Sequence, residues 1–141
     1  MKTTTTALLA ILLLPALLLP ASSVAAPRDE LLASLAAAAK AADPAFSGFS
    51  AARGEKLHVT RFTGGKAQTP SCTSCHGDSP RSAGRTPAGK AIDALAVSVT
   101  PTRYTDPAKV EKWFKRNCQE VLGRQCTPLE KGDWLSAMIS R

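Results

Sequence analysis

Residues 71–77 read "SCTSCHG", and this segment constrains the architecture of the chain more than any other. Cys72 and Cys75 stand three positions apart, and His76 follows the second cysteine directly. The spacing C-x-x-C-H is the attachment sequence for c-type haem. Each thiol can form a thioether with one vinyl group of the porphyrin, and the histidine can then turn beneath the iron as the proximal ligand. The sequence therefore predicts one covalently attached haem c, bound by Cys72, Cys75 and His76.

Two other chemistries also use paired cysteines. A C-x-x-C pair can act as a redox dithiol, but no βαβ pattern surrounds this one. It can also supply half of a zinc site, but the remaining cysteines, Cys118 and Cys126, lack a C-x-x-C spacing. Haem attachment is therefore preferred over both alternatives.

An export signal precedes the haem motif. Residues 1–26 have a basic start, an apolar stretch and small residues at the end, which is the layout of a secretory signal cleaved after Ala26. The alternative is an uncleaved anchor, but a spanning helix needs roughly 20 apolar residues and prolines interrupt this run. We therefore expect a periplasmic product, residues 27–141, that forms a single monohaem domain without stable membrane insertion.

The composition points to a small core and an acidic partner. The chain has four Phe, two Trp and one Tyr, so its side chains alone build only a modest core. A porphyrin would supply the missing apolar area. The formal net charge is +7, which in an exported protein favours an acidic protein partner over nucleic acid.

Helices joined by long loops are the expected elements. The expected helical segments are 28–42, a short one around Gly54, 106–121 and 127–140. Asp106-Pro107 and the capping box Thr127-x-x-Glu130 mark the starts of the last two. Long loops in so small a domain are reasonable if they enclose a prosthetic group. The predicted fold is all-α, with about four short helices and long loops wrapped around one covalently bound haem.

Cys118 and Cys126 remain once the haem motif is assigned. In an exported protein, a disulfide closing this short loop is the expectation, and free thiols are the alternative.

The residue on the other face of the iron is less obvious. Electron-carrying cytochromes c commonly use methionine there. Met1 leaves with the signal, and Met138 lies on the apolar face of the last helix, where we expect core packing. His58 is the next candidate, and an ordinary surface or hydrogen-bonded histidine is the preferred interpretation.

Asn117 interrupts an apolar stripe of the third expected helix. Val110, Trp113, Phe114 and Val121 share one narrow face of that helix, and Asn117 falls in its middle. A buried, unpaired amide costs about 1–3 kcal/mol, so this side chain should have a partner. The pattern alone leaves two choices open: a hydrogen bond to backbone or a haem propionate, or capping of the ferric iron by the amide oxygen.

Five segments of the chain carry a family resemblance: "TGGKAQTPSCTSCHG", "GRTPAGKAI", "RYTDPAKVEKWFKRNC", "VLGRQCTPLEKGD" and the closing tryptophan helix. They resemble the sphaeroides haem protein (SHP) family, class I cytochromes c that carry the domain called DUF1924. The resemblance covers nearly all of residues 27–141. The chain departs from the family at "AIDALAVS", where prolines are expected near Asp93 and Val97. This departure concerns the shape of a haem-flanking loop rather than the ligands.

The resemblance implies a class I cytochrome c-like fold and a concrete site. It implies that His76 is the proximal ligand, that Asn117 is the sixth ligand and that Cys118 pairs with Cys126. It further implies that the asparagine leaves the iron on reduction, so that ferrous haem binds oxygen or nitric oxide. A dihaem cytochrome c is the implied electron-transfer partner. A neutral amide oxygen is a hard, weak ligand that suits ferric better than ferrous iron, which agrees with this behaviour.

The expected function is electron transfer combined with binding of diatomic gases. The alternative is a haem enzyme that consumes nitric oxide, oxygen or peroxide, although no acid–base pair is visible beside the expected iron site. Lys109, Lys112, Lys115 and Arg116 line the solvent face of the tryptophan helix. These charges either solvate the helix or form a docking surface for an acidic redox partner.

Overall fold

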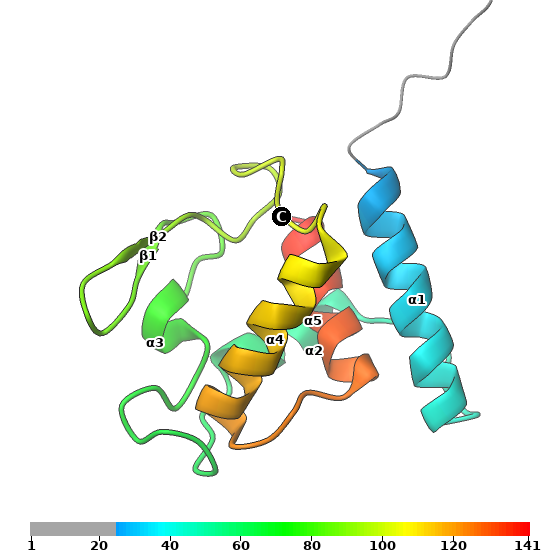
Figure 1. Cartoon of the computed structure of the whole chain (residues 1–141), viewed down its shortest axis with the longest axis horizontal. Coiled ribbons are helices and arrows are strands. Elements are labelled where there is room, and N and C mark those ends of the chain that lie inside the picture. Colours follow the sequence, from blue (N-terminus) through cyan, green and yellow to red (C-terminus); the bar gives the residue numbers. More distant parts are fainter. Residues whose placement is uncertain (1–24) are drawn as a thin grey trace, which may run out of the picture.

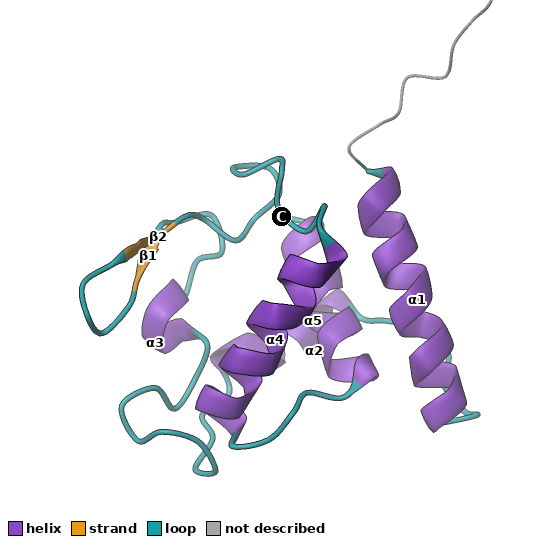
Figure 2. Ribbon diagram, in the orientation of Figure 1, coloured by secondary structure: helices purple, strands orange, loops and turns teal. Residues whose placement is uncertain are grey.

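A computed structural model describes residues 25–141 of the chain (Figures 1 and 2). In chain order the elements are α1 (Ala26–Ala42), α2 (Ala51–Val59), α3 (Thr73–His76), β1 (Gly84–Arg85), β2 (Ala91–Ile92), α4 (Pro107–Leu122) and α5 (Pro128–Ile139). The predicted all-α class is confirmed, and the expected helices appear as α1, α2, α4 and α5. The predicted signal segment lies outside the described residues, apart from its last two positions. Within 25–141, no helix is long and apolar enough to cross a membrane.

The starts of α4 and α5 are fixed by the local signals predicted from the sequence. The Asp106 carboxylate accepts a 3.0 Å hydrogen bond from the Lys109 backbone N–H at the start of α4. At the start of α5, Thr127 and Glu130 form a reciprocal capping box, in which each side chain accepts from the backbone N–H of the other residue. Such caps satisfy backbone donors that the first turn leaves unpaired.

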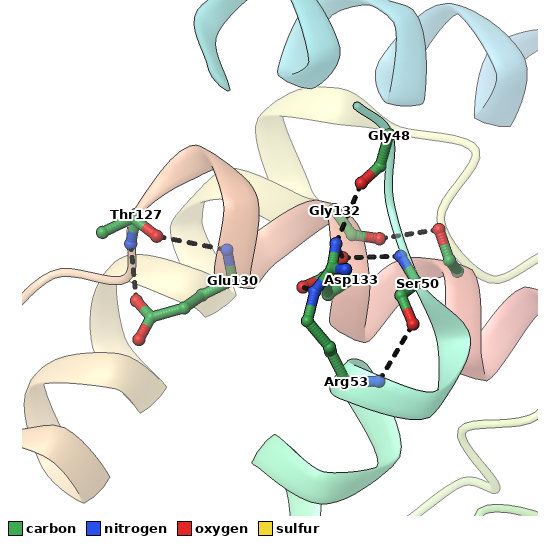
Figure 3. A network of polar contacts seen from close by, with 8 residues as sticks. Gly48, Ser50, Arg53, Thr127, Glu130, Gly132 and Asp133 are labelled. Carbon is green, nitrogen blue, oxygen red and sulfur yellow. Dashed lines mark hydrogen bonds and ion pairs between the residues drawn. The ribbon is translucent and has the colours of Figure 1, made fainter. Parts of the chain in front are cut away.

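The helix α5 lies at the centre of the molecule, and both α1 and α2 pack against it (Figure 1). Its Asp133 carboxylate is buried and ties α5 to the start of α2 (Figure 3). Arg53 donates to this carboxylate through Nε at 2.6 Å and Nη2 at 2.8 Å, and the Ser50 backbone N–H donates at 2.7 Å. The charge is thus buried with its hydrogen bonds satisfied, as burial of a carboxylate requires.

The apolar core consists of two small clusters. One contains Cys118, Val121, Leu122 and Cys126 at the end of α4, and the other contains Leu95, Ala137 and Met138. Trp134 of α5 connects them, because it packs against the second cluster and meets Phe114 of α4 edge-on at 5.6 Å. The four largest fully buried side chains are Leu135, Met138, His58 and Thr69. Two of these four are polar, so the apolar interior is limited, as the composition predicts.

A short β-hairpin and the helix α3 lie between α2 and α4, where the sequence predicts no defined helix or strand. Gly84 pairs with Ile92 and Arg85 with Ala91 in antiparallel register. A Cβ on Gly84 would overlap the Cys75 carbonyl oxygen, so the hairpin contacts α3 backbone to backbone. Each strand has two residues, and a strand this short has no alternating pattern from which it could be predicted.

The loop at the family departure, residues 93–104, is held by side chains from its own C-terminal end. Arg103 donates to the carbonyl oxygens of Asp93 and Ala94, each at 2.6 Å. The Tyr104 hydroxyl donates to the Leu95 carbonyl at 2.9 Å. The loop therefore keeps its apolar residues in the core through hydrogen bonds rather than through prolines.

Candidate haem site

The helix α3 gathers the three residues of the haem motif in one turn. The His76 backbone N–H donates to the Cys72 carbonyl at 3.1 Å, and both Cys72 and Cys75 are free thiols. Gly77 ends the turn with φ at +70°, a conformation that side chains with a Cβ rarely adopt. The two thiols and the imidazole are therefore presented from one short, well-defined piece of backbone.

The electrostatics at the cysteines argue against a redox dithiol. Burial raises the pKa of Cys72 to about 11. The pKa of Cys75 is also raised, by burial first and by the Glu120 carboxylate second. A reactive dithiol needs a thiol whose pKa is lowered, so neither sulfur has the environment of a redox nucleophile.

The imidazole of His76 is half-buried, and its buried Nδ1 atom has no hydrogen-bond partner. Burial lowers its pKa to about 4, and the nearby charges of His58 and Arg103 add to this effect. Among the described residues, His76 Nδ1 is the one buried side-chain nitrogen or oxygen atom that lacks a partner. Neutral imidazole is the form that binds a metal. An orphaned nitrogen of a neutral histidine, directly after two free thiols, fits a covalently attached haem.

A protein-only metal site does not form around the motif. A structural zinc site needs four protein ligands. Across residues 25–141, no group of three His, Cys, Asp or Glu side chains converges in a way that could hold a metal ion. The zinc alternative therefore lacks its remaining ligands.

Asn117 lies half-buried on α4, where the predicted apolar stripe divides. Phe114, Cys118 and Val121 turn toward the core, whereas Trp113 remains 45% exposed. Asn117 falls between these two groups, and its side chain makes no hydrogen bond to any other described residue. Trp113 therefore lies on the solvent side of the stripe, one helical turn before Asn117.

Glu120, one turn beyond Asn117, connects this part of α4 to the segment that leads into the haem motif. The Thr69 hydroxyl donates to its carboxylate at 3.4 Å, and Lys66 forms an ion pair with it at 3.6 Å. The same carboxylate is close enough to Cys75 to raise the pKa of that thiol. Sequence reasoning missed Glu120, although its i+3 spacing from Asn117 places the two side chains on neighbouring parts of one face.

The structure places a disulfide between Cys118 and Cys126, with the Cα atoms 5.6 Å apart. The bond joins the last turn of α4 to the segment before α5, and both residues belong to the first core cluster. It starts at the residue next to Asn117, so it anchors the end of the helix on which that amide lies.

The two other candidates for a sixth ligand are engaged elsewhere. Met138 is fully buried and packs in the cluster with Leu95 and Ala137. His58 is 2% exposed, and both of its ring nitrogens have hydrogen-bond partners, in Gly77 and Trp134. Of the two interpretations left open for His58, the structure shows a buried, hydrogen-bonded histidine and not a surface one, and Met138 fills the core.

A half-buried neutral histidine after a C-x-x-C pair, presented by an all-α fold with long loops, indicates the class of c-type cytochromes. Comparison with known proteins agrees. Residues 44–138 match the domain of unknown function DUF1924. The cytochrome c-type protein SHP of Cereibacter sphaeroides is 56% identical over 90 residues, which cover 62% of this chain and 70% of that protein. The chain belongs to the DUF1924 family.

Solved structures of relatives show the same fold. Oxidised SHP, described as an oxygen-binding cytochrome c, superposes with a TM-score of 0.74 at 47% identity, over 82% of this chain and 96% of that one. Oxidised cytochrome c″ of Methylophilus methylotrophus gives a TM-score of 0.72 at 28% identity, over 84% of this chain and 96% of that one. The predicted cytochrome c-like fold is confirmed. These relatives are c-type cytochromes, so covalently bound haem c is the cofactor of the family.

Proposed function

We propose that this chain is a periplasmic monohaem c-type cytochrome, residues 27–141 after removal of the signal. It transfers electrons, and its reduced form binds oxygen or nitric oxide at the position that Asn117 vacates. The observation that carries the proposal is the half-buried amide of Asn117 on α4, which has no hydrogen-bond partner among the described residues. Relatives support it, because SHP is an oxygen-binding cytochrome c and a solution structure of cytochrome c″ concerns haem-ligand detachment.

Each residue of the motif has a separate role in this proposal. Cys72 and Cys75 hold the porphyrin through thioethers, and His76, already neutral because burial lowers its pKa to about 4, binds the iron. Haem c supplies the one-electron iron centre. The role of Asn117 is to hold the other side through a neutral amide oxygen, a hard donor that binds ferric iron in preference to ferrous iron.

The Cys118–Cys126 disulfide limits how far Asn117 moves. The bond fixes the last turn of α4 to the start of the next segment, one residue beyond Asn117. An amide that detaches from this anchored helix stays close to its original position. It would therefore remain available to compete with a gas ligand and to bind ferric iron again.

Absorption spectra test the proposed role of Asn117. The oxidised and the reduced protein, both under inert gas, should show high-spin bands, and the reduced form should bind nitric oxide or oxygen. Asn117→Ala should change the oxidised spectrum, whereas Gln119→Ala, on the exposed side of the same helix, should leave it unchanged. A sharp low-spin spectrum in both oxidation states, or an Asn117→Ala spectrum identical to that of the unaltered protein, would contradict the proposal.

A turnover assay distinguishes a carrier from an enzyme. An electron carrier that binds gases should consume nitric oxide or oxygen in stoichiometric amounts when an external reductant is supplied. Sustained consumption over many equivalents would instead assign the chain to haem enzymes that turn over nitric oxide, oxygen or peroxide.

The redox partner in this proposal is an acidic protein, and the family resemblance makes it a dihaem cytochrome c. Lys112, Lys115 and Arg116 of α4 line an open groove of about 810 Å³, to which Lys66 adds a fourth cation from the loop before the haem motif. Glu120 is the acidic residue of this lining, and Lys66 pairs with it. A groove with this excess of positive charge suits an acidic docking surface.

A further inference from the structure

His58 lies at the C-terminal end of α2 beside the haem histidine, and the proposed function assigns it no role. Its ring centroid is 6.4 Å from that of His76. It is one of the four largest fully buried side chains in the described part of the chain. An imidazole so deeply buried is stable only if both ring nitrogens are paired, so its partners reveal what it holds in place.

The hydrogen bonds of His58 fix its tautomer. The indole Nε1–H of Trp134 donates to His58 Nδ1 at 3.3 Å. Indole is a donor only, so Nδ1 must accept and the single ring proton resides on Nε2. His58 Nε2 lies 3.1 Å from the Gly77 carbonyl oxygen, which is an acceptor, and therefore donates to it. One neutral tautomer satisfies both contacts, and burial lowers the pKa of His58, which keeps the ring neutral.

Gly77 is the residue that follows His76, and its peptide is held from two sides. Its N–H donates to the Thr73 carbonyl at 3.0 Å within α3, while its C=O accepts from His58 of α2. With φ at +70° and no side chain, Gly77 has no other means of fixing its orientation. The direction in which the chain leaves His76 therefore depends on His58.

His58 is in turn fixed by the aromatic residues around Trp134. The Trp134 ring meets Tyr104 edge-on at 6.0 Å and Phe114 edge-on at 5.6 Å. Phe114 lies on α4 three residues before Asn117. The contacts thus run from α4 through Trp134 and His58 to the backbone beside His76.

We propose that His58 is a positioning residue for His76: by holding the Gly77 carbonyl it orients the imidazole that binds the haem iron. This inference rests on the proposed function, because it takes His76 as the proximal ligand. Replacing His58 with an apolar residue leaves the Gly77 carbonyl and the Trp134 indole unpaired. The chain after His76 then gains freedom, and the iron–histidine bond becomes weaker and less uniform.

Resonance Raman spectroscopy of the reduced protein measures that bond directly, through the iron–histidine stretching band of five-coordinate haem. In His58→Leu the band should move to lower frequency and broaden. His58→Gln keeps a donor for Gly77 and an acceptor for Trp134, so it should restore most of the original band. Trp134→Phe keeps the aromatic packing but removes the donor to Nδ1, and it should shift the band in the same direction by a smaller amount.

A control variant separates positioning from loss of stability. Thr127→Ala removes the capping residue of α5 and should lower the free energy of unfolding without moving the band. If His58→Leu fails to accumulate as haem protein, Trp134→Phe carries the test. An unchanged band in every His58 and Trp134 variant that retains thioether-linked haem would overturn the inference. Absence of any iron–histidine band from the unaltered reduced protein would instead overturn the proposed function.

Discussion

Gly84 shows how a single missing side chain shapes the surroundings of the haem motif. The nearest neighbours of a Cβ at this position would be the Cys75 carbonyl oxygen, with which it would overlap, and the Cα of His76 at 2.9 Å. Both are backbone atoms of a helix pinned by hydrogen bonds, so neither can move aside cheaply. Backbone contact at this distance is possible only for glycine.

We predict that Gly84→Ala displaces the hairpin from α3 and disturbs His76. The free energy of unfolding should fall by about 1–3 kcal/mol, the usual range for overpacking, and the absorption spectrum of the haem protein should change. Gly89→Ala is the matched control: it strains the hairpin turn, where φ is +83°, but a Cβ there meets nothing within 4 Å. Equal spectral changes in the two variants would show that hairpin strain, and not contact with α3, is responsible.

At the scale of residues, the sequence predicts those features that depend on residues close together in the chain. The C-x-x-C-H spacing indicates three candidate site residues, and the structure presents all of them from one turn of backbone. Asn117 stands out because a polar residue breaks a regular stripe. The positions of Glu120 and His58 could not be predicted in this way. Their partners, such as Thr69 and Trp134, are more than 50 residues away in sequence, and no local pattern records such contacts.

At the scale of elements, the negative charge of Glu130 in the capping box of α5 should contribute to the stability of the fold. Arg124 donates to the Glu130 carboxylate at 2.7 and 2.8 Å, and the Thr127 backbone N–H donates at 2.8 Å. The Arg124 guanidinium is the main reason that the pKa of Glu130 lies below its ordinary value. A carboxyl group with a lowered folded pKa stabilises the fold above its unfolded pKa, about 4.3, and loses this contribution as pH falls through the folded value.

Glu130→Gln should therefore weaken the fold at neutral pH and have little effect in acid. Glutamine preserves the capping geometry, so the substitution removes mainly the charge. Because the pair is partly exposed, we expect the free energy of unfolding to fall by about 0.5–1 kcal/mol at pH 7. The two proteins should converge once the pH has fallen below the lowered folded pKa of Glu130, as urea unfolding at each pH would show. A difference that persists unchanged into acid would mean that packing, rather than charge, is lost.

The disulfide acts on the same α4–α5 junction. It closes a loop of sequence separation eight, for which the chain-entropy model gives a stabilisation of about 2.5 kcal/mol. We predict that the double variant Cys118→Ser/Cys126→Ser has a free energy of unfolding lower by this amount, as urea unfolding would measure. Its oxidised absorption spectrum should also change, because the helix end that carries Asn117 is released.

Gln125→Ser provides the matched control, since it lies in the same connecting segment and leaves the disulfide intact. It should alter neither the stability nor the spectrum appreciably. If the double cysteine variant lost stability while its spin state and reduction potential stayed the same, the disulfide would have no part in retaining the ligand.

At this scale the helices were predictable and the connections were not. Asp106 and Thr127 predict the starts of α4 and α5, because an N-cap depends only on residues within four positions of the helix start. The loop 93–104 has no comparable local sequence signal. Its shape depends on Arg103 and Tyr104 reaching back to carbonyl groups nine or ten residues earlier, a contact that residue type alone does not specify.

At the scale of the whole molecule, the apolar core that the side chains build is small. Phe114 of α4 packs on the first apolar cluster and meets Trp134, which joins it to the second cluster. On the same helix Trp113 is nearly half exposed and Asn117 is half-buried. A chain of this size with few aromatic residues has a limited core of its own, and covalently bound haem c would supply apolar area that its side chains lack.

The outer face of α4 is the place where charge should matter to the whole molecule. Lys109, Lys112, Lys115 and Arg116 are all exposed there, and the guanidinium of Arg116 lies 5.5 Å from the centre of the Trp113 ring. This puts a cluster of positive charge next to the half-exposed part of the stripe that carries Asn117. An acidic partner attracted by these charges would therefore arrive on the helix that bears the proposed iron ligand.

Electron-transfer kinetics with a dihaem cytochrome c test this docking surface. The bimolecular rate constant should fall as ionic strength rises, because salt screens the attraction that steers encounter. Lys112→Glu/Lys115→Glu should lower the rate at low salt by about tenfold or more and flatten its salt dependence. Lys40→Glu/Lys56→Glu makes the same change in net charge on the exposed surfaces of α1 and α2, away from α4. If the two pairs slowed the reaction equally, net charge alone would steer the encounter; if salt had no effect, these lysines would merely solvate the helix.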